Sequence, residues 1–191
     1  NNEKLLKGYF KANHYNFLLS MPILSGYLFI APDLIDVIYG EKWLDAVILS
    51  QFFLFSIVIL SLYDRGAALI AGIGRPDLLL KIDLSLFLPL IIGLFISVKF
   101  GILYVVIVVV IERFIAQIVQ LFLLKKYVNL RITTFFNSVK EPFLSSTFMV
   151  LFLYLIQYIL PSALDSKLTL ILQIVLGGLF YFLSIYKLDR D

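Results

Sequence analysis

The chain has 191 residues, of which 61% are hydrophobic and 15% are charged, and its mean hydropathy is +0.99. A water-soluble domain of this composition could not cover its surface with polar groups, so we predict an integral membrane protein. Cysteine is absent, which excludes disulfide bonds and thiolate metal sites. The sequence starts Asn-Asn-Glu-Lys without a methionine, and we expect it to be a piece of a longer polypeptide.

Six apolar segments are long enough to cross a bilayer as helices. In chain order they are residues 12–30, 43–73, 78–98, 102–124, 143–160 and 168–186. The sequence therefore predicts an all-α, polytopic membrane helix bundle with six transmembrane helices and no soluble domain.

Proline, glycine and polar residues mark the connections between these spans. Pro22 is predicted to kink the first span, which we expect to end at Ala31-Pro-Asp33 and to be followed by a short amphipathic piece at 34–39. A tight turn is predicted at 99–101. Residues 132–139 alternate polar and apolar side chains, a pattern that favours an elbow helix lying flat in the membrane interface.

Basic residues predict the orientation of the helices. If the spans alternate, eleven of the sixteen basic residues lie on one side of the membrane and three on the other, while Arg65 and Arg113 lie within spans. The three are Lys42, Lys99 and Lys167. The eleven are Lys4, Lys7, Lys11, Arg75, Lys81, Lys125, Lys126, Arg131, Lys140, Lys187 and Arg190. Because cytoplasmic loops carry the excess of basic residues, the eleven-residue side and both chain ends are predicted to be cytoplasmic.

Four ionisable residues are predicted to lie at depth in the bilayer. Asp64 and Arg65 interrupt the second span, and Glu112 and Arg113 lie roughly 16 Å along the fourth. Charged groups inside a membrane are costly and normally face a protein-lined or watery interior. Because neighbouring residues on a helix point about 100° apart, we expect neither adjacent pair to form a salt bridge, and we expect partners from other helices.

Two polar stripes accompany these charges. Ser61 and Arg65 share one face of the second span, and Arg113, Gln117 and Gln120 follow one another at i, i+4 and i+7 on the fourth. Two helices are therefore predicted to offer polar groups to a common interior.

The charges at depth allow two interpretations. In the first they form interhelical salt bridges, such as Arg65 with Glu112, that fix the packing of the helices. In the second they line a path for an anionic headgroup, because the guanidinium group keeps its charge and binds phosphate through two hydrogen bonds. The residues predicted to bind the anionic group are Arg65, Arg113, Gln117 and Gln120. Asp64 and Glu112 are predicted to take up a coupling proton or sodium ion.

The sequence carries no pattern typical of an enzyme. We find no nucleophile–base set, no phosphate-binding loop and no metal-ligand cluster, and the single histidine, His14, is predicted to form hydrogen bonds near the interface. We therefore predict a protein without catalytic residues, metal sites, cofactors or nucleic-acid partners.

Three motifs resemble those of a known family. Residues 31–46 read Ala-Pro-Asp-Leu-Ile-Asp-Val-Ile-Tyr-Gly-Glu-Lys-Trp-Leu-Asp-Ala, Gly72-Ile-Gly-Arg-Pro76 follows the second span, and Phe100-Gly-Ile102 opens the fourth. Together with the order and lengths of the six spans, these turns resemble polysaccharide flippases of the multidrug/oligosaccharidyl-lipid/polysaccharide exporter superfamily. The greatest similarity is to the colanic-acid and teichuronic-acid exporter branch.

The resemblance implies a protein of two pseudo-symmetric bundles, in which this chain is most of the C-terminal bundle and the N-terminal bundle is its partner. It implies that an undecaprenyl-diphosphate-linked oligosaccharide is moved across the bacterial inner membrane by alternating access, driven by an ion gradient. Other partners expected from it are membrane lipid, a polysaccharide polymerase and a chain-length regulator.

Two other functions remain open. One is export of drugs or small cations, although such exporters of the superfamily favour acidic, aromatic cavities over buried arginines. The other is a non-transporting scaffold for glycan-assembly enzymes, in which the four charged residues would be held in closed pairs. Transport requires instead that some of these side chains line an open cavity.

Overall fold

The computed structural model describes residues 2–159 and 166–188. These residues form six α-helices and two short 3-10 helices, without a strand among them. The elements are α1 (Asn2–Tyr39), η1 (Glu41–Trp43), α2 (Ala46–Gly72), α3 (Asp77–Ser97), η2 (Val98–Phe100), α4 (Ile102–Val128), α5 (Ile132–Ile159) and α6 (Ser166–Leu188). All six α-helices are long and apolar enough to cross a membrane, which confirms the predicted fold class.

The chain divides into two compact units. The first combines Phe52–Ser138 with the start of α1 through Asn13, and the second combines His14–Gln51 with the chain from Val139. Consequently α3 and α4 belong to the first unit and α6 belongs to the second, while α1, α2 and α5 contribute residues to both.

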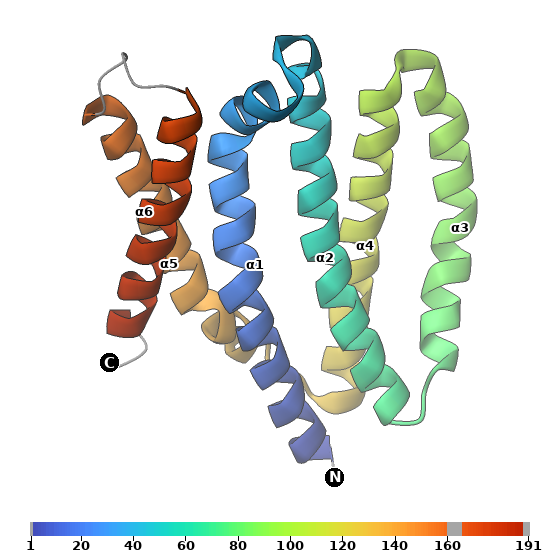
Figure 1. The fold of residues 1–191 in the computed structure, drawn as a ribbon. Helices are drawn as coiled ribbons and strands as arrows, with labels where there is room; N and C mark the ends of the chain where they lie inside the picture. Colours follow the sequence, from blue (N-terminus) through green and yellow to red (C-terminus); the bar gives the residue numbers. More distant parts are fainter. Residues whose placement is uncertain (1, 160–165, 189–191) are drawn as a thin grey trace. The chain divides into compact units, whose positions relative to one another are not determined.

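In the first unit, α3 and α4 form an antiparallel hairpin (Figure 1). The connection is η2 followed by Gly101, whose φ of 112° favours glycine, so the predicted turn at 99–101 is confirmed. Gly93 allows the two helices to approach closely, because a Cβ atom there would lie 2.9 Å from Cγ1 of Val108. A buried cluster joins the hairpin to α2 and consists of Tyr63, Ile82 and Ala116.

The turn between α2 and α3 is held by one arginine. Gly74, with φ of 77°, reverses the chain, as the Gly-Ile-Gly-Arg-Pro motif predicts. Nε and Nη2 of Arg75 donate hydrogen bonds of 2.9 and 3.1 Å to the carboxylate of Asp77, and the guanidinium group lies 4.9 Å from the ring centroid of Tyr127 on α4. The hydrogen bonds to Asp77 raise the pKa of Arg75 above its ordinary value, so this residue stays charged.

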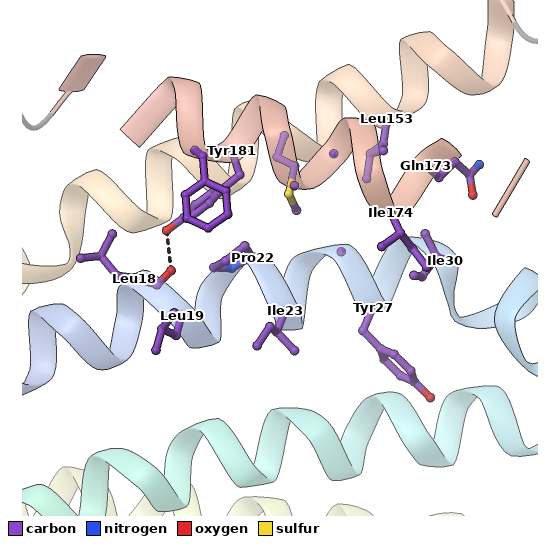
Figure 2. Close-up of a pocket in the computed structure, with 15 residues that line it drawn as sticks. Leu18, Leu19, Pro22, Ile23, Tyr27, Ile30, Leu153, Gln173, Ile174 and Tyr181 are labelled. Carbon is purple, nitrogen blue, oxygen red and sulfur yellow. Dashed lines mark hydrogen bonds between the residues drawn. The ribbon is translucent and has the colours of Figure 1, made fainter. Parts of the chain in front are cut away.

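In the second unit, Pro22 lies inside α1 and leaves the carbonyl oxygen of Leu18 without its helix donor. The hydroxyl group of Tyr181, on α6, donates a hydrogen bond of 2.8 Å to this oxygen (Figure 2). The hydroxyl group of Ser25 donates to the carbonyl oxygen of Met21 at 2.8 Å. The Tyr181 side chain therefore satisfies the backbone oxygen that the proline leaves without a donor, as an apolar environment requires.

The prediction that the first helix ends at Ala31-Pro-Asp33 is wrong. α1 continues through Pro32 to Tyr39, so residues 34–39 are its last turns and not a separate piece. Pro32 leaves the carbonyl oxygen of Leu28 without its helix donor, and Nε2 of Gln51 on α2 donates to that oxygen at 3.0 Å. The helix can continue because a residue far along the chain replaces the lost backbone bond.

Residues 132–139 are helical, as predicted, but they do not form a helix of their own. These residues are the first turns of α5, which continues through Pro142 to Ile159. Phe135 and Pro142 are both buried, so packing stabilises the helix before and after the predicted boundary. Residue 160, the predicted end of the fifth span, and Arg190, one of the eleven basic residues on the predicted cytoplasmic side, lie outside the described residues.

The core of the second unit lies where α5 and α6 pack together. Its buried residues are Met149, Leu153, Tyr181 and Ile185. The rings of Phe152 and Phe180 stack with centroids 4.2 Å apart, and Leu153 packs closely against the position of Gly177. Tyr181 thus contributes its ring to this core and its hydroxyl group to α1.

We predict that Tyr181→Phe lowers the free energy of unfolding by about 1 kcal/mol, because it leaves the Leu18 carbonyl unsatisfied. Denaturant unfolding of the purified protein in detergent would measure the change. Pro22→Ala restores the backbone donor for the Leu18 carbonyl. In that background Tyr181→Phe should therefore lower the free energy of unfolding much less. Tyr158→Phe is the control, since Tyr158 is 91% exposed and should tolerate the change. An equal cost of Tyr181→Phe in both backgrounds would mean that the phenol acts through packing alone.

Candidate functional site

The six residues predicted to bind substrate or ion all lie in the first unit, on α2 and α4. They are Asp64, Arg65, Glu112, Arg113, Gln117 and Gln120. The two helices contact one another directly, because Nε2 of Gln120 donates a hydrogen bond of 2.9 Å to the carbonyl oxygen of Tyr63. The two predicted polar stripes therefore lie on neighbouring helices.

Arg65 is half-buried and is held by two hydrogen bonds. Its Nε donates to Oδ1 of Asn13 at 2.9 Å, and its Nη2 donates to the hydroxyl oxygen of Ser61 at 3.1 Å. The predicted shared face of Ser61 and Arg65 is confirmed by the second contact. Asn13 is fully buried and donates to the carbonyl oxygen of Tyr9 at 3.0 Å, so the arginine links α2 to the start of α1.

Asp64 differs from Arg65 in that its side chain is exposed. It forms no hydrogen bond or salt bridge with any residue in the described part of the chain, although its charge acts on Arg65. An exposed carboxylate eight residues before the end of an apolar helix is costly beside acyl chains. This face of α2 therefore suits contact with water or with polar protein groups.

Glu112 and Arg113 form a salt bridge, which corrects the prediction that adjacent residues would not pair. Oε2 of Glu112 lies 3.5 Å from Nε of Arg113, and the two side chains are 15% and 38% exposed. Their Cα–Cβ directions diverge, but both side chains are long enough to turn toward each other. Arg65 bonds to Asn13 and Ser61 instead of Glu112, so the interhelical bridge given as the first interpretation is not formed.

The salt bridge between Glu112 and Arg113 has poor hydrogen-bond geometry. Oε2 of Glu112 is buried, yet it has no hydrogen-bond partner among the described residues, so the salt bridge lacks the geometry of a hydrogen bond. A bidentate pair would have two short bonds. The contact is therefore weaker than a bidentate salt bridge.

Gln120 is completely buried against α2, where Gly66 provides the space for it. A Cβ atom at residue 66 would collide with the carboxamide group of Gln120, and moving that group would break its bond to Tyr63. Gln117 is also buried, at 6% exposure, and neither of its amide atoms has a partner in the described part of the chain. Both glutamines are thus enclosed, with Gln120 at the contact with α2, whereas Asp64 and Arg113 are reachable.

Sequence reasoning missed two contacts of this site. It did not single out Asn13, whose only signal was an amide at helical spacing between the apolar residues Tyr9 and Phe17. It also did not join Tyr63 to Asp83, although the tyrosine hydroxyl donates a hydrogen bond of 2.9 Å to Oδ1 of the aspartate. Both contacts connect residues far apart in sequence, so only the helix packing reveals them.

A separate groove of about 350 Å³ lies in the second unit, between α1, α5 and α6 (Figure 2). Its lining is mostly aliphatic and includes no charged residue and none of the six predicted site residues. Gln173 is the buried polar residue of this lining, with 1% exposure. The groove offers apolar surface and cannot provide the charge that an anionic headgroup requires.

We predict that Gly66→Ala is strongly destabilising, on the order of 2 kcal/mol or more, because it displaces Gln120 from its bond to Tyr63. Gly178→Ala is the matched control, since a Cβ atom there meets no atom within 4 Å and alanine favours a helix. Denaturant unfolding should show a loss for the first variant and none for the second. A Gly66→Ala variant as stable as the unmodified protein would contradict the close α2–α4 contact.

Two curated proteins are similar to the chain over nearly its whole length. The teichuronic acid biosynthesis protein TuaB of Bacillus subtilis (strain 168) is 26% identical over 189 residues, which are 97% of this chain and 39% of that protein. An uncharacterized membrane protein in the cps region of Klebsiella pneumoniae is 27% identical over 188 residues, which are 96% of this chain and 38% of that protein.

No family model matches the chain, and no solved structure matches it significantly. The chain spans about two fifths of the length of the curated relatives that it matches. It is a multi-pass, all-helical membrane protein that is similar to a membrane protein of polysaccharide synthesis.

Proposed function

We propose that this chain is part of a flippase that moves a lipid-linked oligosaccharide, carried on undecaprenyl diphosphate, across the bacterial inner membrane for surface polysaccharide export. The observation that carries the proposal is the sequence similarity to a teichuronic acid biosynthesis protein, which extends over 97% of the chain at 26% identity. The six membrane-length helices fit a transport role. Because the chain spans 39% of that relative, the proposal includes the remaining helices of a second, N-terminal bundle.

The polar groups of α2 and α4 support an anionic cargo. A diphosphate carries negative charge and needs cationic donors when it leaves water, and a guanidinium group provides them without losing its own charge. Arg113 is 38% exposed and Arg65 is half-buried, so both can be reached by a ligand. Gln117 and Gln120 are packed inside the unit, and Gln120 would act by holding α4 against α2 in the state described.

The Glu112–Arg113 contact suggests a way to couple the cargo to an ion. In the proposed cycle, a phosphate group displaces Glu112 from Arg113, because it offers the guanidinium group bidentate hydrogen bonds that the carboxylate does not. The released carboxylate then takes up a proton or sodium ion from the gradient. Release of the ion on the other side of the membrane and loss of the cargo would let the salt bridge form again, which would return the protein to its starting state by alternating access.

The proposal includes the membrane orientation and partners of the protein. Both chain ends are assigned to the cytoplasm, because they lie on the side with eleven basic residues. The polysaccharide polymerase and the chain-length regulator that would use the exported oligosaccharide are proposed partners. The intact gene should restore surface polysaccharide to a strain that lacks its own flippase, and failure to do so with correct membrane insertion would argue against the function.

A scaffold for glycan-assembly enzymes is the second candidate function. It is favoured by the contacts of the arginines, since Arg65 is bonded to Asn13 and Ser61, and Arg113 is paired with Glu112. In that case the charges would stabilise the bundle and have no cargo. The exposed side chain of Asp64 does not fit this alternative, because a closed scaffold would leave it without a partner.

A charge-pair experiment separates the two functions. Arg113→Gln in the full-length protein should reduce surface polysaccharide on the order of tenfold, because the anionic cargo loses its cationic donor. If the salt bridge is only structural, removing both charges in Arg113→Gln/Glu112→Gln restores function, since no unpaired charge remains. We expect no restoration. The control is Lys99→Gln, which removes one exposed positive charge in the α3–α4 turn and should leave the amount of surface polysaccharide unchanged.

The coupling role of Glu112 gives a second prediction. Transport in proteoliposomes should depend on an imposed pH or sodium gradient, and Glu112→Gln should weaken that dependence, because an amide cannot bind and release a proton at physiological pH. Transport of labelled lipid-linked oligosaccharide with and without the gradient would measure this. If the variant responds to the gradient as the unmodified protein does, Glu112 has no coupling role.

A further inference from the structure

A pocket of about 440 Å³ lies where α4 ends and α5 begins. It is lined by Lys125, Asn129, Leu130, Arg131, Ile132 and Thr133. Asn129 caps α4 in the left-handed conformation, with φ of 54°, and this allows the chain to turn directly into α5. All of these residues belong to the first unit.

The pocket has positive charge that no neighbouring group neutralises. Lys125 and Arg131 are exposed, and neither side chain forms a salt bridge or hydrogen bond with a residue of the described ranges. No acidic residue lines the pocket. The site therefore offers two cations to an anion and has no carboxylate that would repel it.

The pocket also lies at the boundary between apolar and polar surface. Ile118 and Phe122 are 39% and 62% exposed and lie on the same face of α4 as Lys125, at spacings of seven and three residues. On the α5 side, Phe136 is 63% exposed one turn after Thr133. An occupant of this pocket would therefore meet cations at one end and exposed aromatic and aliphatic groups at the other.

We propose that this pocket binds the phosphate headgroup of an anionic phospholipid from the surrounding bilayer. The headgroup would contact Lys125 and Arg131, and its acyl chains would lie along Ile118 and Phe122. A soluble phosphate would use the cations and leave the apolar surface uncovered, so the arrangement favours a lipid. This inference does not depend on the cargo proposed for α2 and α4, because it uses different residues.

The test is native mass spectrometry of the intact protein. The protein in detergent is mixed with phosphatidylglycerol or phosphatidylcholine, and the fraction that carries bound lipid is measured after the detergent is removed. We expect phosphatidylglycerol to bind more tightly, and we expect Lys125→Gln/Arg131→Gln to weaken it on the order of tenfold without changing phosphatidylcholine binding. The matched control is Lys4→Gln/Lys7→Gln, which removes two exposed positive charges of the first unit outside the pocket. This control should leave phosphatidylglycerol binding unchanged.

Two results would overturn the inference. An equal loss of phosphatidylglycerol binding in both double variants would mean that the lipid responds to net charge and not to this pocket. Displacement of phosphatidylglycerol by millimolar inorganic diphosphate would mean that the site selects a soluble anion. Circular dichroism and gel filtration of each variant would verify folding, and since all four substituted side chains are exposed, we expect no change.

Discussion

Polar groups inside an apolar helix bundle are costly unless they find partners within the protein, and this constraint explains the hydrogen bonds that join the helices. Two prolines of α1 each free one carbonyl oxygen, and side chains from α6 and α2 donate to those two oxygens. The carboxamide group of Gln120 serves the same purpose between α4 and α2. Hydrogen bonds of this kind fix which helices are neighbours, because apolar packing alone would tolerate several arrangements.

The same constraint divides the polar residues of α2 and α4 into two groups. Gln117 and Gln120 are both enclosed by helix packing, and the hydrogen bond from Gln120 to the carbonyl oxygen of Tyr63 holds α4 against α2. Asp64, Arg65 and Arg113 remain reachable, and the Glu112–Arg113 contact lacks hydrogen-bond geometry. In the proposed transport function, the reachable groups would exchange partners with a cargo or an ion, while the enclosed Gln120 maintains the contact between α2 and α4.

An unpaired charge at a helix end has different surroundings from a charge in the middle of a membrane-length helix. The basic residues where α4 meets α5 lie beside exposed aromatic side chains, so they suit a lipid headgroup at the membrane surface. Arg65 and Arg113 lie within membrane-length helices, where an anion can reach them only through a polar path. The position of an arginine along its helix therefore decides how readily an anion can reach it.

The sequence alone determined the number and order of the membrane helices, because the apolar runs and the glycine turns at 72–76 and 99–101 act locally. It also located the charged residues of α2 and α4. It could not predict that α1 continues through Pro32, since the compensating donor, Gln51, lies on another helix. Nor could it find that Asn13 bonds to Arg65, or that Glu112 turns toward its neighbour. These contacts depend on how the helices pack and on side-chain conformations, which helical spacing does not specify.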